Sequence, residues 1–153
     1  MKLTLSKINQ MLGALNSLSG GRSRVIETNG QASGSVVESF TFPAQTKVNI
    51  IHNVGVLRPL AETYSEALKQ ITKDVSPDGT NAAIDADPAL LRQYQKRHEE
   101  LLESKLSAKG LLYINWETLE TAKVDTNTVA NLGKLVRGIP APSDADLIKD
   151  EEV

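Results

Sequence analysis

One stretch of the chain places apolar residues at alternating spacings of four and three. The positions are Ile50, Val54, Leu57, Ala61, Tyr64, Leu68 and Ile71. Because residues at these spacings lie along one side of an α-helix, they predict a long helix with an unbroken apolar seam. A seam of this kind is stable only when another surface covers it. The sequence therefore predicts a helix that packs lengthwise against a partner.

The limits of this helix follow from its prolines and glycine. Pro43 suits a first helical turn, so the helix is expected to begin near Ala44 and to run to Lys73, about 45 Å in length. Pro59 cannot donate the hydrogen bond to residue 55, and Gly55 leaves room for the proline ring, so we expect a kink there. A competing interpretation makes residues 48–57 a strand and begins the helix at Pro59. The seam runs through this segment without slipping, which favours the helix.

A second helix is expected to fold back on the first. Asp87 can cap its start, with Pro88 at the first helical position, and the helix is predicted to reach Lys109. Its apolar side carries Leu91, Tyr94, His98, Leu101 and Leu102. The preceding residues 75–85 form a small, polar loop. The two helices therefore predict an antiparallel hairpin over residues 44–107, approximately.

Shorter elements surround this hairpin. A strand at Leu3 and Leu5 leads into a helix capped by Ser6 and ended by Gly20 and Gly21. Strands are expected around residues 24–28 and 35–42, joined by a loop that contains Asn29-Gly30 and is too long for a two-residue turn. Alternation over residues 112–116 predicts a strand that joins them. Asp125 or Asn127 caps a last helix that ends at Gly138.

These elements predict an α+β fold. It has a long antiparallel helical hairpin, a short N-terminal helix, a small and mostly antiparallel sheet, and a short C-terminal helix. A length of 153 residues with 40% hydrophobic content suits one domain, which we place at residues 1–138. Residues 139–153 form an acidic tail.

Composition excludes several functions. The chain has no cysteine, which removes disulfides, thiolate catalysis and cysteine-bound metals. Aromatic residues make up only 4%, which argues against base stacking. The tail holds five acidic residues and one basic residue, Lys149, so its charge is −4. Because the net charge of the chain is −2, the remaining body carries +2. With no broad basic field, nucleic-acid binding is not expected, and no apolar run approaches the ~18 residues of a membrane span.

No catalytic or metal-binding motif emerges. His52 and His98 lie on separate predicted helices without a neighbouring carboxylate or histidine. Asp78, Asp85 and Asp87 lack the spacing of a calcium loop and are better explained as turn and cap residues. Neither glycine-rich segment ends in the Lys-Ser/Thr pair of a phosphate loop. The sequence predicts a non-enzymatic protein without a cofactor, a metal or catalytic residues.

The long seam raises the question of what covers its beginning. Residues 48–54 extend past the expected hairpin partner, so either the N-terminal helix or another subunit must cover them. The sequence leaves both alternatives open. The candidate contact residues are Val48, Ile51, Val54 and Leu57 on the helix, and Asp144, Asp146, Asp150 and Glu151 in the tail.

Three segments resemble small uncharacterised proteins of tailed bacteriophages. They are the opening Met-Lys-Leu-Thr-Leu-Ser-Lys-Ile, the apolar helix segment 46–60 that contains Asn53, and His98-Glu99-Glu100-Leu101-Leu102. The similarity covers most of residues 1–137, but not the segment 20–34 or the loop 74–87. It implies a virion component, either a head decoration, a connector or neck protein, or a tail protein. It carries no catalytic residues.

That resemblance defines the expected partners. The chain is expected to form a homo-oligomer and to contact neighbouring virion proteins, with no membrane partner, and to reside in the virion or the host cytoplasm. The alternative is a small phage or bacterial regulator or inhibitor that binds one host protein, with residues 48–57 or the acidic tail as its contact surface.

Overall fold

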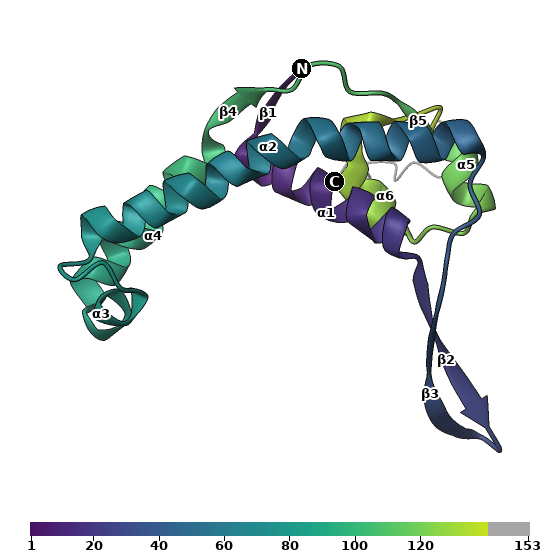
Figure 1. Cartoon of the computed structure of the whole chain (residues 1–153), viewed down its shortest axis with the longest axis horizontal. Helices are drawn as coiled ribbons and strands as arrows, with labels where there is room; N and C mark the ends of the chain where they lie inside the picture. Colours follow the sequence, from purple (N-terminus) through teal and green to yellow (C-terminus); the bar gives the residue numbers. More distant parts are fainter. Residues whose placement is uncertain (141–153) are drawn as a thin grey trace, which may run out of the picture.

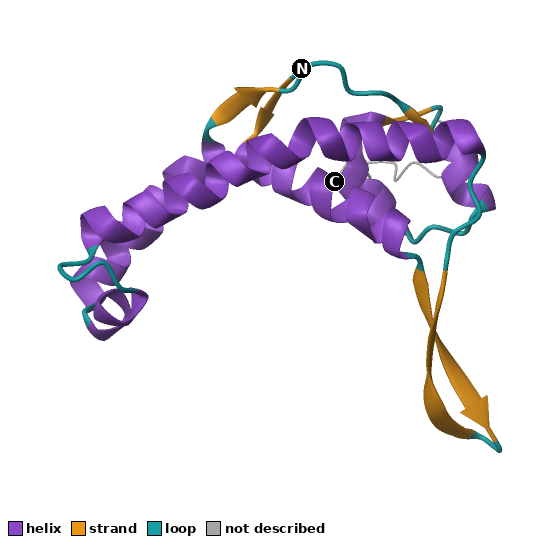
Figure 2. Cartoon of the chain, viewed as in Figure 1, coloured by secondary structure: helices purple, strands orange, loops and turns teal. Residues whose placement is uncertain are grey.

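A small body carries two projections that leave it in different directions, one helical and one a β-ribbon (Figure 1). The computed structural model describes residues 1–140, and for residues 22–25 it describes the backbone only. Figure 2 shows that helices make up most of the body and, apart from loops at its tip, one projection. The α+β class with a long helix is confirmed.

The N-terminal strand and helix form as one unit. Strand β1 spans Lys2–Thr4 and helix α1 spans Leu5–Gly20. The cap is Thr4, whose hydroxyl accepts the Lys7 N–H at 3.2 Å, so the predicted cap at Ser6 was two residues late. Leu5 is already a buried residue of the first turn, which fixes the earlier start. The apolar face of α1 supplies much of the core with Leu5, Ile8, Met11, Ala14, Leu15 and Leu18.

The long helix is confirmed. Helix α2 spans Ala44–Val75, begins directly after Pro43 and continues through Pro59. Residues 48–57 are helical, so the competing strand interpretation is wrong. The Thr63 hydroxyl donates to the Pro59 carbonyl at 3.2 Å on the far side of the proline. Figure 1 shows α2 curving as it leaves the body, as expected where a proline interrupts the hydrogen-bond ladder.

Helix α2 has a different partner along each half. Its first half packs against α1, and its second half packs antiparallel to helix α4, Pro88–Glu103 (Figure 1). Asp87 caps α4 as predicted, accepting the Ala89 N–H at 2.9 Å. The segment predicted to be a loop contains a short helix, α3, Asn81–Ala86, which is capped by Thr80 and packs on α4 at the tip. The antiparallel hairpin is therefore present, with an added turn of helix at its end.

The helical projection is thin. It consists of the second half of α2 with α3 and α4, and we call it the arm. No residue of α4 is buried, and beyond Leu57 the only buried residue of α2 is Val75 at the tip. The Tyr64 hydroxyl is hydrogen-bonded to His98 Nε2 at 2.6 Å across the two helices. A two-helix arm without a third layer leaves its seam half covered.

The second helix ends earlier than predicted. It stops at Glu103 instead of Lys109, and strand β4, Lys105–Ser107, pairs antiparallel with β1. Leu3 lies opposite Leu106, and the Ala108 N–H donates to the Met1 carbonyl at 2.8 Å. Local spacing gives no sign of this pairing, because the two strands are about a hundred residues apart.

The strands do not form one sheet. Instead, three separate two-stranded ladders are described. Besides β1 with β4, strand β2 (Arg22–Thr28) pairs antiparallel with β3 (Gln31–Glu38), and β5 (Ile114–Asn115) pairs in parallel with β6 (Val136–Arg137). The prediction that residues 112–116 join the earlier strands is wrong.

A side-chain clamp explains why β5 is so short. Asn53 is fully buried in α2 and makes two hydrogen bonds, each 2.8 Å, with the backbone of Leu112. Its Nδ2 donates to the Leu112 carbonyl, and its Oδ1 accepts the Leu112 N–H. Asn49 donates to the Tyr113 carbonyl at 3.2 Å, and His52 donates to the Gly110 carbonyl at 2.7 Å. Residues 110–113, here called the strap, lie outside any strand and bond to a helix.

The C-terminal part holds two short helices. Helix α5 spans Trp116–Thr121, where a strand end was predicted, and α6 spans Thr126–Leu132. Asp125 is the cap, accepting the Thr128 N–H at 2.9 Å. The helix ends at Gly133 (φ 54°), five residues before the predicted Gly138, and a 3₁₀ turn, η1 (Gly133–Leu135), leads into β6. Leu132 and Leu135 are buried and complete the body core.

Replacing Asn53 tests the clamp. In Asn53→Ala the Leu112 amide and carbonyl lose the partners that the fully buried Asn53 supplies, and we expect the free energy of unfolding to fall by about 2–4 kcal/mol. Asn49→Ala removes one exposed bond to the same strap and should cost less than about 1 kcal/mol. Urea denaturation of both variants measures the difference. Equal effects of the two substitutions would contradict the role given to Asn53.

Candidate protein-binding surface

The two histidines have structural partners. His52 bonds to the Gly110 carbonyl, and His98 bonds to Tyr64 and stacks near Tyr94 at a ring separation of 6.0 Å. Burial, and then the nearby Tyr94, raise the pKa of the Tyr64 hydroxyl, so this group keeps its proton at neutral pH. Within residues 1–140, no three His, Asp or Glu side chains gather as a metal-binding group. The absence of enzyme activity stays a prediction.

The aspartates of the arm tip act locally. Asp78 accepts hydrogen bonds from the Thr80 hydroxyl, the Thr80 N–H and the Ser76 hydroxyl, at 2.7–3.0 Å. These bonds, led by that of the Thr80 hydroxyl, hold the pKa of the Asp78 carboxyl below its usual range. Asp87 is occupied as the cap of α4. The carboxylates thus shape a turn and a helix start.

The β2–β3 ribbon is the most exposed part of the described chain. Asn29 and Gly30 have φ values of 53° and 76°, the geometry of a two-residue hairpin turn with both central residues left-handed. The prediction of a longer loop is therefore wrong. The small residues after Gly30 pair as part of β3, and Ser33 is the extra residue of a bulge between the pairs Ile26–Gly34 and Glu27–Ala32. The ribbon projects well beyond the body (Figure 1).

Apolar side chains are exposed on this ribbon. Ile26, Val36 and Val37 are all exposed, and Val37 has 63% of its surface accessible. Each strand pairs only with the other, so the outer edge of each is unpaired within the described residues. Residues 31–37 contain no charge and no proline, the usual means by which edge strands avoid association. The surface is suited to pairing with another polypeptide.

A steric constraint fixes the root of the ribbon. Gly21 ends α1 with φ 79°, and a Cβ at this position would collide with the Glu38 carbonyl, where β3 returns to the body. Only glycine both adopts this positive φ readily and leaves room for the Glu38 carbonyl. The ribbon therefore leaves the body at a set point between the end of α1 and the start of α2.

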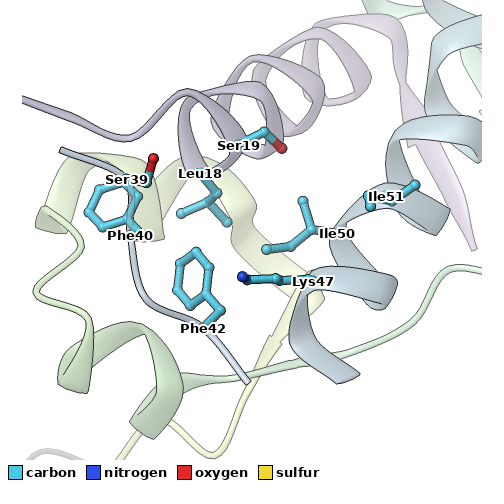
Figure 3. Close-up of a pocket in the computed structure, with 8 residues that line it drawn as sticks. All are labelled: Leu18, Ser19, Ser39, Phe40, Phe42, Lys47, Ile50 and Ile51. Carbon is cyan, nitrogen blue, oxygen red and sulfur yellow. The ribbon is translucent and has the colours of Figure 1, made fainter. Parts of the chain in front are cut away.

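A small cavity lies at this root. It has a volume of about 260 Å³ and is lined by Leu18, Ser19, Ser39, Phe40, Phe42, Lys47, Ile50 and Ile51. We call it the root pocket. Figure 3 shows Leu18, Phe42 and Ile50 pointing toward one another, with the Lys47 amine reaching between the last two. The rings of Phe40 and Phe42 lie 5.7 Å apart. Apolar side chains form most of the lining, together with the two serines and one cationic group, Lys47.

The predicted contact residues of α2 divide into two sets. Val48 and Ile51 are 55% and 69% exposed, whereas Leu57 is fully buried and Val54 is half-buried against the core. Helix α1 covers the seam here, so the first of the two alternatives for residues 48–54 holds within the single chain. Leu57 is unavailable to a partner. Val48 and Ile51 remain exposed, and Ile51 lines the root pocket together with Leu18 and Ser19 of α1.

The other predicted contact residues are not part of the described structure. Asp144, Asp146, Asp150 and Glu151 fall within residues 141–153, outside the described residues. Sequence reasoning did not identify Val37 or Phe40 as surface candidates. The Asn29-Gly30 pair was the signal for the ribbon, and treating the following four residues as a loop concealed its length.

Comparison with known proteins returns no relative. The chain matches no protein-family profile, no curated protein and no solved structure. Among the described helices, none combines the length and the apolar character needed to cross a membrane.

Substitutions on α2 should separate surface from core. Val48→Lys and Ile51→Lys replace exposed side chains, and each should change the free energy of unfolding by less than about 0.5 kcal/mol. Leu57→Ala removes a fully buried side chain and should cost about 3 kcal/mol. Thermal and urea denaturation at low protein concentration give both values. A large loss in either lysine variant would show that the outer face of α2 is covered within one chain.

Proposed function

We propose that this chain is a non-enzymatic structural or assembly protein of a tailed-phage particle. It acts by contacts with copies of itself and with neighbouring particle proteins. The observation that carries the proposal is the β2–β3 ribbon, which extends from the body with exposed valines and, within residues 1–140, has no third strand.

Physical chemistry favours a partner for this ribbon. A lone two-stranded hairpin is marginally stable in water, because few side chains gain burial for the backbone entropy lost. The described side chains of β3 are exposed along the strand except at Glu38, which is half-buried. A strand added at the charge-free edge of β3 would satisfy its outward N–H and C=O groups and cover apolar surface.

The arm adds a second extended surface. Its seam is covered on one side only, and Tyr64, Leu68 and Leu91 are half-buried. Two projections on one small body allow a subunit to hold more than one neighbour at a time. Repeated copies in a ring or shell then gain stability through multivalency, even if each contact is weak.

The phage context is supported by the resemblance of three segments to tailed-phage proteins. They are the opening strand and helix, the helix segment around Asn53, and residues 98–102. In the fold, Asn53 clamps the strap to α2, so one of the resembling segments carries the main polar contact of the body. We place the protein in the head, the connector or neck, or the tail of the particle.

Native mass as a function of concentration tests the proposal. The wild-type chain should associate as its concentration rises in light scattering. Val37→Lys places a charge on the ribbon and should raise the concentration needed for association by about tenfold or more, equivalent to about 1.4 kcal/mol. Ile139→Lys is the matched control: Ile139 is an exposed apolar residue outside the ribbon. Its association should equal that of the wild type.

Two outcomes would contradict the proposal. If the wild-type chain stays monomeric at every concentration and is absent from purified particles, it is not an assembly protein. If it instead captures a single host protein in a defined complex, the alternative of a small regulator is correct. Equal weakening by Val37→Lys and Ile139→Lys would remove the ribbon as the contact surface.

A further inference from the structure

The root pocket has the chemistry of a site for a short acidic and apolar peptide. Its walls come from the end of α1, the segment that follows β3, and the start of α2. A volume of about 260 Å³ is below the usual range of about 300–1,000 Å³ for small-molecule sites, and fits one or two aliphatic side chains. Lys47 forms no ion pair with any described residue. An occupant that brings a carboxylate would pair it.

The C-terminal segment of the chain has this composition. Leu147 and Ile148 are adjacent, with Asp144 and Asp146 before them and Asp150, Glu151 and Glu152 after them. Lys149 is the single basic residue of residues 139–153, so this segment carries −4. The aliphatic pair matches the apolar walls of the pocket, and the flanking acids match Lys47.

The segment also starts close enough to reach the pocket. The described chain ends at Pro140, shortly after β6. Strand β6 pairs with β5, which directly follows Tyr113, and Asn49 of α2 bonds to Tyr113 within a turn of Lys47 and Ile51. The eight peptide steps from Pro140 to Ile148 span up to about 26 Å at about 3.3 Å each. That exceeds the diameter of α2, about 10–12 Å.

We propose that residues 146–150 bind in the root pocket of their own chain. Leu147 and Ile148 fill the apolar space beside Phe42 and Ile50, and a neighbouring carboxylate pairs with Lys47. Tethering raises the local concentration of the segment to the millimolar range, so a weak intrinsic affinity suffices. The bound segment covers the apolar root of the ribbon and lies next to Ile51, where it competes with any neighbouring subunit. This inference is independent of the proposed function.

Disulfide trapping tests this contact in the full-length chain, which has no cysteine of its own. In Ile51→Cys/Ile148→Cys, mild oxidation with oxidised glutathione should form a bond within one chain, read from intact mass and non-reducing gels. The control Lys69→Cys/Ile148→Cys places the first cysteine on the same helix, about 27 Å further along. The first pair should form at least about tenfold faster. Adding Lys47→Glu to it should slow trapping.

Three results would overturn the inference. Equal trapping rates in the two pairs would show that the segment has no preference for the pocket. Bonds formed only between chains would assign it to a neighbouring copy. As a second measurement, Leu147→Asp/Ile148→Asp in the cysteine-free chain should increase amide hydrogen exchange in residues 39–51, and unchanged exchange there would also contradict it. None of these results depends on whether Val37→Lys weakens assembly. The inference about the root pocket and the proposed assembly function can therefore be refuted independently.

Discussion

Helix α2 belongs to two packing units at once, and the rest of the structure depends on this. Its first half lies between α1 and the strap, where Ile50, Asn53 and Leu57 are buried. Among residues 1–140, its second half has only α4 as a lengthwise partner, and no residue of that half is buried before Val75. The core of the chain is therefore concentrated in the body, and the seam of the arm is only half covered among the described residues.

Asn53 gives the first half its topology. Its amide takes the place of a strand partner for Leu112, so the strap crosses α2 without a sheet beneath it. The strap in turn sets the start of β5, which pairs with β6 and closes the C-terminal part over α1. A buried amide with both of its groups bonded specifies a position that an aliphatic residue could not.

Local physics made much of the fold predictable. The seam gave α2, and Asp87 and Asp125 gave the starts of α4 and α6, because periodicity and capping act within a few residues. The features that the sequence did not predict are the pairing of β1 with β4, the separation of the ladders, and the strap. Each depends on contacts between residues far apart in sequence. The exposure of individual apolar residues also depends on such non-local contacts. Periodicity placed Leu57 on an apolar face of the helix. It could not show which neighbouring element would cover that face.

In the described chain the body has a buried core, whereas the arm and the ribbon leave apolar surface exposed. Amide hydrogen exchange of the full-length chain, measured from dilute to concentrated solution, tests this most directly. We expect body amides in α1 and in α2 around Asn53 to be protected at every concentration. The ribbon, residues 22–38, should exchange rapidly when dilute and become protected as the chain associates. Strong ribbon protection in the dilute monomer, or none at any concentration, would contradict the account.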